Sequence, residues 1–229
     1  GVLGDRKALE LATKCAEFIL ENQFDKGIFH RLNYSGQVTI PAQSEDYALF
    51  IKALLDLHNV CPEQDRWLTE AITIQQEFDR RLWHESTGGY YNSSPEAAPD
   101  LLVREKAYMD SAIPSANGTA IANLVRISLL TDNLDYRDRS RQGLCAFATI
   151  MERSPQACPT LFTALDWLLN GNLVKTRSET FKDLIPRYFP TTVYRIVTDL
   201  PEGVVGLTCN ETSCLEPATS LAELIMQFN

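Results

Sequence analysis

The stretch SANGTAIANLVRISLL at residues 115–130 predicts a helix that is apolar on nearly every side. Its apolar side chains surround a lone charge, Arg126. A helix that is apolar all round must be buried all round. Residues 44–58 and 155–169 have the same character, with few charges beyond Lys52, Asp56 and Asp166. The sequence therefore predicts three inner helices.

Three further segments predict amphipathic helices with one apolar stripe each, over residues 7–23, 65–82 and 135–151. They alternate with the inner helices along the chain. This alternation is typical of an α/α toroid built from helical hairpins, because a four-helix bundle would show the same polarity in every helix. Three hairpins make about half of a six-hairpin ring. We expect a mainly α fold in which residues 1–170 form a partial toroid, and a chain that is a fragment of a longer protein.

Residues 171–229 have a different texture and predict a small C-terminal α/β appendage as a second domain. We expect strands at 173–176, 192–197 and 204–209, a helix at 178–188 with Ser178 as its N-cap, and a closing helix at 221–228. The segment is too small for a nucleotide-binding domain. The chain also has no Gly-rich phosphate loop.

Two connections are long, residues 24–43 and 83–114, and both precede an inner helix. They should therefore lie at the same end of the toroid. Loops of more than about 12–15 residues in a compact domain are usually functional or disordered. Gly27-Ile-Phe-His30 is loosely repeated as Gly88-Gly-Tyr-Tyr91, and we expect a short β-hairpin in each loop.

Polar side chains gather at this long-loop end, and we expect them to face one shallow cavity. Asp46 and Asp110 are the candidate acid–base residues, because paired carboxylates beside Arg and Tyr suit sugar hydroxyls and acid–base chemistry. The candidate substrate-binding residues are Arg31, Glu45, Tyr47, Arg104, Lys106, Ser115 and Asn117.

Structural roles explain several of these residues equally well. Glu45 and Asp46 are ordinary first-turn acids behind a cap at Ser44. Arg104 and Asp110 could pair to hold their loop. Asn-Gly at 117–118 is costly at a helix start, and a local cost without a local reason favours function.

Composition excludes other classes of function. The net charge of -9 would repel a nucleic-acid backbone, and no apolar run reaches the roughly 18 residues of a membrane span. Three histidines without paired spacing predict no metal site, and no cofactor is expected. Six cysteines are too sparse for a disulfide scaffold. We expect reduced cysteines, Cys209 and Cys214 included, in a cytoplasmic protein, with a redox or metal role for that pair as the alternative.

Several motifs resemble one known family. Ser44-Glu-Asp-Tyr-Ala48 resembles its L-D-D-Y-A helix start, and residues 78–91 resemble its F-W-D…G-G-F/Y segment. Residues 102–117 resemble its R-x-K…D-G-A-x-P-S-x-N signature, and residues 209–217 its C…C-x-x-P ending. The chain is thus similar, over nearly its whole length, to the YyaL-like family of thioredoxin-domain-containing proteins, which includes spermatogenesis-associated proteins. Ser44, Glu45 and Ser111 depart from the family's usual Leu, Asp and Gly.

The resemblance implies an N-terminal thioredoxin-like domain outside this chain, followed by an (α/α)6 toroid similar to N-acylglucosamine 2-epimerases and six-hairpin glycosidases. It therefore implies a protein that binds or modifies a carbohydrate, although the paired catalytic histidines of the epimerases are not evident. The alternative is a non-catalytic scaffold that regulates the thioredoxin-like domain. A third hypothesis is self-association, because an incomplete toroid exposes apolar surface.

Overall fold

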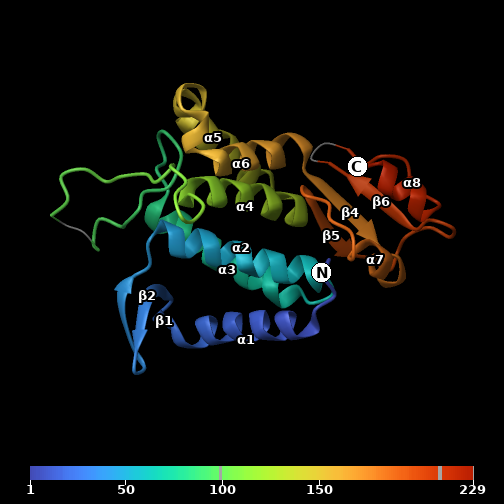
Figure 1. Ribbon diagram of the computed structural model, residues 1–229, viewed down its shortest axis with the longest axis horizontal. Coiled ribbons are helices and arrows are strands. Elements are labelled where there is room, and N and C mark those ends of the chain that lie inside the picture. Colours follow the sequence, from blue (N-terminus) through green and yellow to red (C-terminus); the bar gives the residue numbers. More distant parts are fainter. Residues whose placement is uncertain (98–99, 211–212, 229) are drawn as a thin grey trace.

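A computed structural model describes residues 1–97, 100–210 and 213–228. The fold is mainly α, as the sequence predicts. Three inner helices lie side by side with α4 in the middle, and an outer helix precedes each of them along the chain (Figure 1). The inner helices are α2 (Ser44–Val60), α4 (Ala116–Thr131) and α6 (Pro159–Asn170). The outer helices are α1 (Arg6–Asn22), α3 (Asp65–Leu82) and α5 (Leu134–Arg153).

Helix α4 is buried over residues 116–130, so the prediction for this helix is confirmed. It packs against α2 on one side, α6 on the other, and α5. Asn123 links it to α2, because its Nδ2 donates a hydrogen bond to the Ala48 carbonyl at 2.8 Å. At Gly118 the helix approaches α6 so closely that a Cβ would lie 2.7 Å from the carbonyl carbon of Thr160. This contact is a structural reason for the costly glycine.

Helix α6 departs from the prediction in two ways. It begins at Pro159, behind a separate 3-10 turn, η1 (Pro155–Ala157), because a proline inside a helix clashes with the carbonyl four residues earlier. It also lies at the edge of the row, so Phe162 and Leu169 are 39% and 70% exposed. Burial all round is therefore wrong for this helix. Self-association through such surface stays a prediction.

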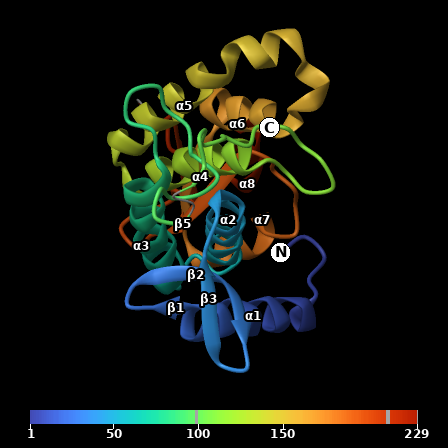
Figure 2. The same ribbon diagram turned by 90° about the vertical axis from the view of Figure 1, so that its left-hand side faces the viewer.

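The first long loop folds as the expected β-hairpin. Strands β1 (Phe24–Asp25), β2 (Ile28–Tyr34) and β3 (Gln37–Pro41) are antiparallel. Ser35 and Gly36 both have positive φ, which a two-residue turn between twisted strands requires. This sheet and the second long loop lie at the same end of the molecule (Figures 1 and 2). In the described part of the second loop the predicted hairpin is reduced to one antiparallel bridge between Trp83 and Tyr90, where the His84 N–H donates to the Gly89 carbonyl.

The C-terminal sheet lies at the opposite end of the helices (Figure 1). Its elements are β4 (Asn172–Thr176), α7 (Ser178–Leu184), β5 (Thr192–Ile196), β6 (Gly206–Cys209) and α8 (Leu221–Met226), with strand order β5-β4-β6. Leu173 and Val193 join the helical core, whereas Val174 and Tyr194 pack with α7 and α8. The N-cap of α7 is Arg177 rather than Ser178. A boundary between two domains near residue 170 stays a prediction.

Cys209 and Cys214 form a disulfide, which corrects the expectation that both are reduced. They face each other as a bridge pair after β6 turns back, so their side chains meet. Residues 211–212 between them lie outside the described residues. Cys15, Cys61, Cys145 and Cys158 are free.

The helices in the described ranges include none that combines the length and the apolar character needed to cross a membrane.

Replacing Gly118 by Ala should destabilise the protein, although helix propensity alone would stabilise α4 by about 1 kcal/mol. The new Cβ would meet the backbone of Thr160 and Leu161, so α4 and α6 must separate, which costs roughly 1–3 kcal/mol. Gly143→Ala is the control, because the nearest atoms to its Cβ belong to side chains, Ile121 at 3.0 Å and Trp83 at 3.8 Å, rather than to the backbone. Urea denaturation measures both, and a stabilised Gly118→Ala variant would contradict the close approach.

Candidate functional site

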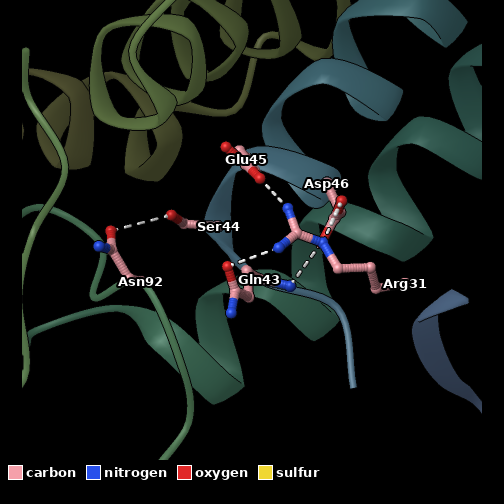
Figure 3. Close-up of polar contacts among 6 residues, drawn as sticks. All are labelled: Arg31, Gln43, Ser44, Glu45, Asp46 and Asn92. Carbon is pink, nitrogen blue, oxygen red and sulfur yellow. Dashed lines mark hydrogen bonds and ion pairs between the residues drawn. The ribbon is translucent and has the colours of Figure 1, made fainter. Parts of the chain in front are cut away.

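Arg31 on β2 connects the hairpin to the start of α2 (Figure 3). Its Nη1 donates to Gln43 Oε1 at 2.8 Å, its Nε lies 3.0 Å from Asp46 Oδ2, and its Nη2 contacts the Glu45 carboxylate. Asp46 Oδ2 also accepts the backbone N–H of Gln43 at 2.8 Å. The helix therefore has Gln43 rather than Ser44 as its N-cap. Asp46 holds the start of α2, while Glu45 is the more exposed of the two carboxylates.

Asp110 binds the N-termini of two inner helices at once. Its Oδ1 accepts the backbone N–H of Ser115 at 2.6 Å, and its Oδ2 accepts that of Thr160 at 2.8 Å. The Thr160 hydroxyl also donates to Oδ1. A carboxylate at a helix N-terminus satisfies N–H groups that lack intrahelical partners. Both oxygens of Asp110 are thus engaged in joining α4 to α6.

Asn117 holds the second long loop against α4. Its Oδ1 accepts the Tyr90 N–H at 2.7 Å, and its Nδ2 donates to the carbonyls of Tyr90 and Ala107 at 3.0 and 2.8 Å. The side chain is fully buried. Ser115 is the N-cap of α4, and its Oγ accepts the Gly118 N–H at 3.4 Å.

Tyr47 points into the core rather than toward a cavity. It is fully buried, stacks on Phe78, and donates its hydroxyl to Glu77 Oε1 at 2.8 Å. Burial, followed by the Glu77 carboxylate, raises the pKa of Tyr47. Glu77 also accepts the Phe29 N–H, so this network joins α2, α3 and the hairpin. Orientation of a ligand by Tyr47 is therefore excluded by its position.

Arg104 and Lys106 lie in a separate cluster on the second loop. Arg104 donates to the Ser93 carbonyl and stacks over Tyr91 at 3.8 Å, so it does not pair with Asp110. Lys106 Nζ lies 2.8 Å from His84 Nδ1, and burial lowers the pKa of Lys106. The pKa of His84 is lowered by desolvation and by the two neighbouring cations. The sequence predicts no role for His84, because its contact with Lys106 joins residues that are 22 positions apart and no motif links them.

One cleft of about 190 Å³ opens at the N-termini of α2 and α4. Of the predicted residues, Glu45 and Ser115 line it, together with Gln43, Ser44, Asn92, Ala107, Met109, Ser111, Ile113, Pro114 and Ala116. The expected single cavity for all the predicted residues is therefore wrong. Asn92 was missed, although it positions the wall: its carbonyl accepts the Ser44 N–H and its Oδ1 the Ala107 N–H. No cluster of three or more His, Cys, Asp or Glu side chains suited to a metal ion occurs within the described ranges.

The alternating inner and outer helices and the cleft define a protein built from helical hairpins, with a polar cleft at the N-termini of two inner helices. The chain is 36% identical over 174 residues to spermatogenesis-associated protein 20 of Rattus norvegicus, and 34% identical to that of Homo sapiens. It is 32% identical to an uncharacterized protein of Caenorhabditis elegans. These matches cover 72%, 72% and 70% of this chain. The chain belongs to the family of spermatogenesis-associated protein 20, as its motifs indicate.

The chain spans only 22–23% of the length of these relatives. No model of a protein family matches it. A solved structure of a GH76 alpha-mannanase of Bacteroides thetaiotaomicron is similar with a TM-score of 0.49 and 16% identity, over 63% of this chain and 39% of that one.

Replacing Asp110 by Asn tests whether this carboxylate is structural. The amide would place a donor against the backbone N–H of Ser115 or Thr160, so the free energy of unfolding should fall by about 1–3 kcal/mol. Asp138→Asn on the exposed face of α5 is the control and should change it by less than about 0.5 kcal/mol. Thermal or urea denaturation distinguishes them, and an Asp110→Asn variant as stable as the wild type would return Asp110 to the catalytic candidates.

Proposed function

We propose that the long-loop end of this chain binds a carbohydrate and that the chain itself does not catalyse a reaction there. The observation that carries the proposal is the cleft above α2 and α4, with a carboxylate, two amides and three hydroxyl side chains on its wall. Such groups donate to and accept from sugar hydroxyls. Its volume lies below the roughly 300–1,000 Å³ typical of drug-sized ligands, which suits a single sugar ring.

Binding is favoured over catalysis because the two candidate acid–base residues are engaged elsewhere. Asp46 holds the start of α2 with Arg31, and Asp110 joins α4 to α6. Neither lines the cleft. Glu45 is the carboxylate that does, and Arg31 holds it in place through an ion pair. We therefore assign ligand contact to Glu45 and Ser115 rather than to the two aspartates.

Isothermal calorimetry with a panel of neutral mono- and oligosaccharides tests this proposal. Glu45→Gln should weaken binding about fivefold, because a charge-assisted hydrogen bond is roughly twice as strong as a neutral one. Glu63→Gln, at an exposed position after α2, is the matched control and should bind as the wild type does. Ser111→Phe should fill the cleft and abolish binding. A panel without any binder, or equal affinity in Ser111→Phe, would contradict the proposal.

A second function is favoured by a different observation at the same end. Leu101, Leu102 and Val103 form an exposed apolar run on the second loop, with Leu102 wholly exposed. Such a run is typical of a surface that binds another protein segment. The chain would then be a scaffold that regulates the thioredoxin-like domain implied by the family resemblance. The proposal includes a cytoplasmic location. The disulfide between Cys209 and Cys214 argues against that location alone, because disulfides are rare in reducing compartments.

A disulfide-reduction assay on a longer family protein that carries both parts tests the scaffold. A triple variant with serine in place of Leu101, Leu102 and Val103 should change the rate of disulfide reduction at least about twofold. Its free energy of unfolding should stay within about 0.5 kcal/mol of the wild type, because these side chains are exposed. Serine at the exposed Leu11 of α1 is the control. A rate that responds to neither substitution would contradict regulation through the loop.

A further inference from the structure

A second cavity lies at the other end of the inner helices, against the C-terminal sheet. It has a volume of about 450 Å³, within the roughly 300–1,000 Å³ of small-molecule sites. Helices α2, α4 and α6 form one wall, and Gly1, Val2 and residues between 185 and 194, which include the start of β5, form the other. It shares no lining residue with the cleft at the long-loop end.

Arg126, the lone charge of α4, lines this cavity while only 5% of the residue is exposed. Its Nη2 lies 2.8 Å from Asp56 Oδ1, and its guanidinium stacks over Trp167 at 5.5 Å. The Nε–H of the same guanidinium has no hydrogen-bond partner among the described residues. A charged group buried this deeply is costly, so its retention at a cavity wall indicates a ligand for the part of the guanidinium that lines the cavity.

The other charges of the cavity favour an anion. Asp56 is shared, because its Oδ2 also accepts from Lys52 Nζ at 2.6 Å. The charged side chains on the wall are Lys52, Arg126 and Arg187 against Asp56 and Asp166, an excess of one positive charge. Trp167 and Asp56 hold the guanidinium in place before any ligand arrives, which reduces the entropy lost on binding.

We propose that this cavity binds a compound of monosaccharide size that carries a carboxylate or phosphate group. Arg126 binds that group through the part of its guanidinium that lines the cavity, since its Nε is enclosed by protein atoms. A guanidinium suits either anion, because it is always charged and presents several planar N–H donors. The remaining volume, bounded by Thr163 and Trp167, holds the rest of the compound.

Calorimetry on the 229-residue chain with glucose 6-phosphate, glucuronate and glucose tests the proposal. At least one of the two charged sugars should bind, at least tenfold more tightly than glucose and more weakly at high salt. The two charged probes distinguish a phosphate from a carboxylate. The two proposals can fail separately. Ser111→Phe alters only the long-loop cleft, so binding of a charged sugar that persists in this variant occurs elsewhere, even where no neutral sugar binds the cleft.

Thr163→Phe should fill the cavity from the exposed face of α6 without removing a buried charge, and should weaken binding at least tenfold. Thr69→Phe is the matched control, because Thr69 is exposed on α3 and its hydroxyl makes the same bond to the carbonyl four residues earlier. Arg126→Lys keeps the charge and loses the planar N–H donors, so it should also weaken binding if it folds. No binding of either charged sugar, equal binding of glucose, or unchanged affinity in Thr163→Phe would overturn the proposal.

Discussion

The burial of α4 on every side is the constraint on which the rest of the structure depends. A helix without a solvent face can pack closely only where its side chains are small, and at Gly118 the backbone of α6 takes the space of a side chain. The polar groups of α4 must then bond to neighbouring elements. Asn123 bonds to α2, and Asn117 bonds to the second long loop. The position of the cleft is therefore a consequence of how α4 is packed.

Periodicity was sufficient to predict the helices because each buries a stripe that local spacing reveals. The bounds of α3 agree with the prediction at both ends, and those of α2 and α4 differ by one or two residues. Periodicity does not predict which elements pack against a helix. The composition of α6 resembles that of α4, yet Phe162 and Leu169 are exposed because the row of inner helices ends there. Apolar composition indicates what a helix could bury, not what lies beside it.

The polar residues were harder to predict because their partners are distant in sequence. Asp110 meets Thr160 fifty residues later, and Tyr47 meets Glu77 thirty residues later. The residue types at the long-loop end suggested a shared cavity, but most of these side chains satisfy one another or the backbone. The disulfide was missed for a related reason, since the spacing of Cys209 and Cys214 does not show that the chain reverses between them. Residue type thus predicted which end of the helices carries polar side chains. Only the contacts distinguish Glu45, which lines the cleft, from neighbours that hold the fold.

Whether a buried polar group has used all of its hydrogen bonds separates a structural role from a binding role. Asn117 and Asp110 have committed both ends of their side chains to the fold, so a ligand would have to break existing bonds to reach them. Arg126 differs because its guanidinium is fixed by Asp56 and Trp167 while its side chain also lines a cavity. A charged group that is held rigidly at a cavity wall loses little conformational entropy when it binds an anion. By this criterion Arg126 has a binding role at the end of the inner helices near the C-terminal sheet, whereas Asn117 and Asp110 at the long-loop end hold the fold.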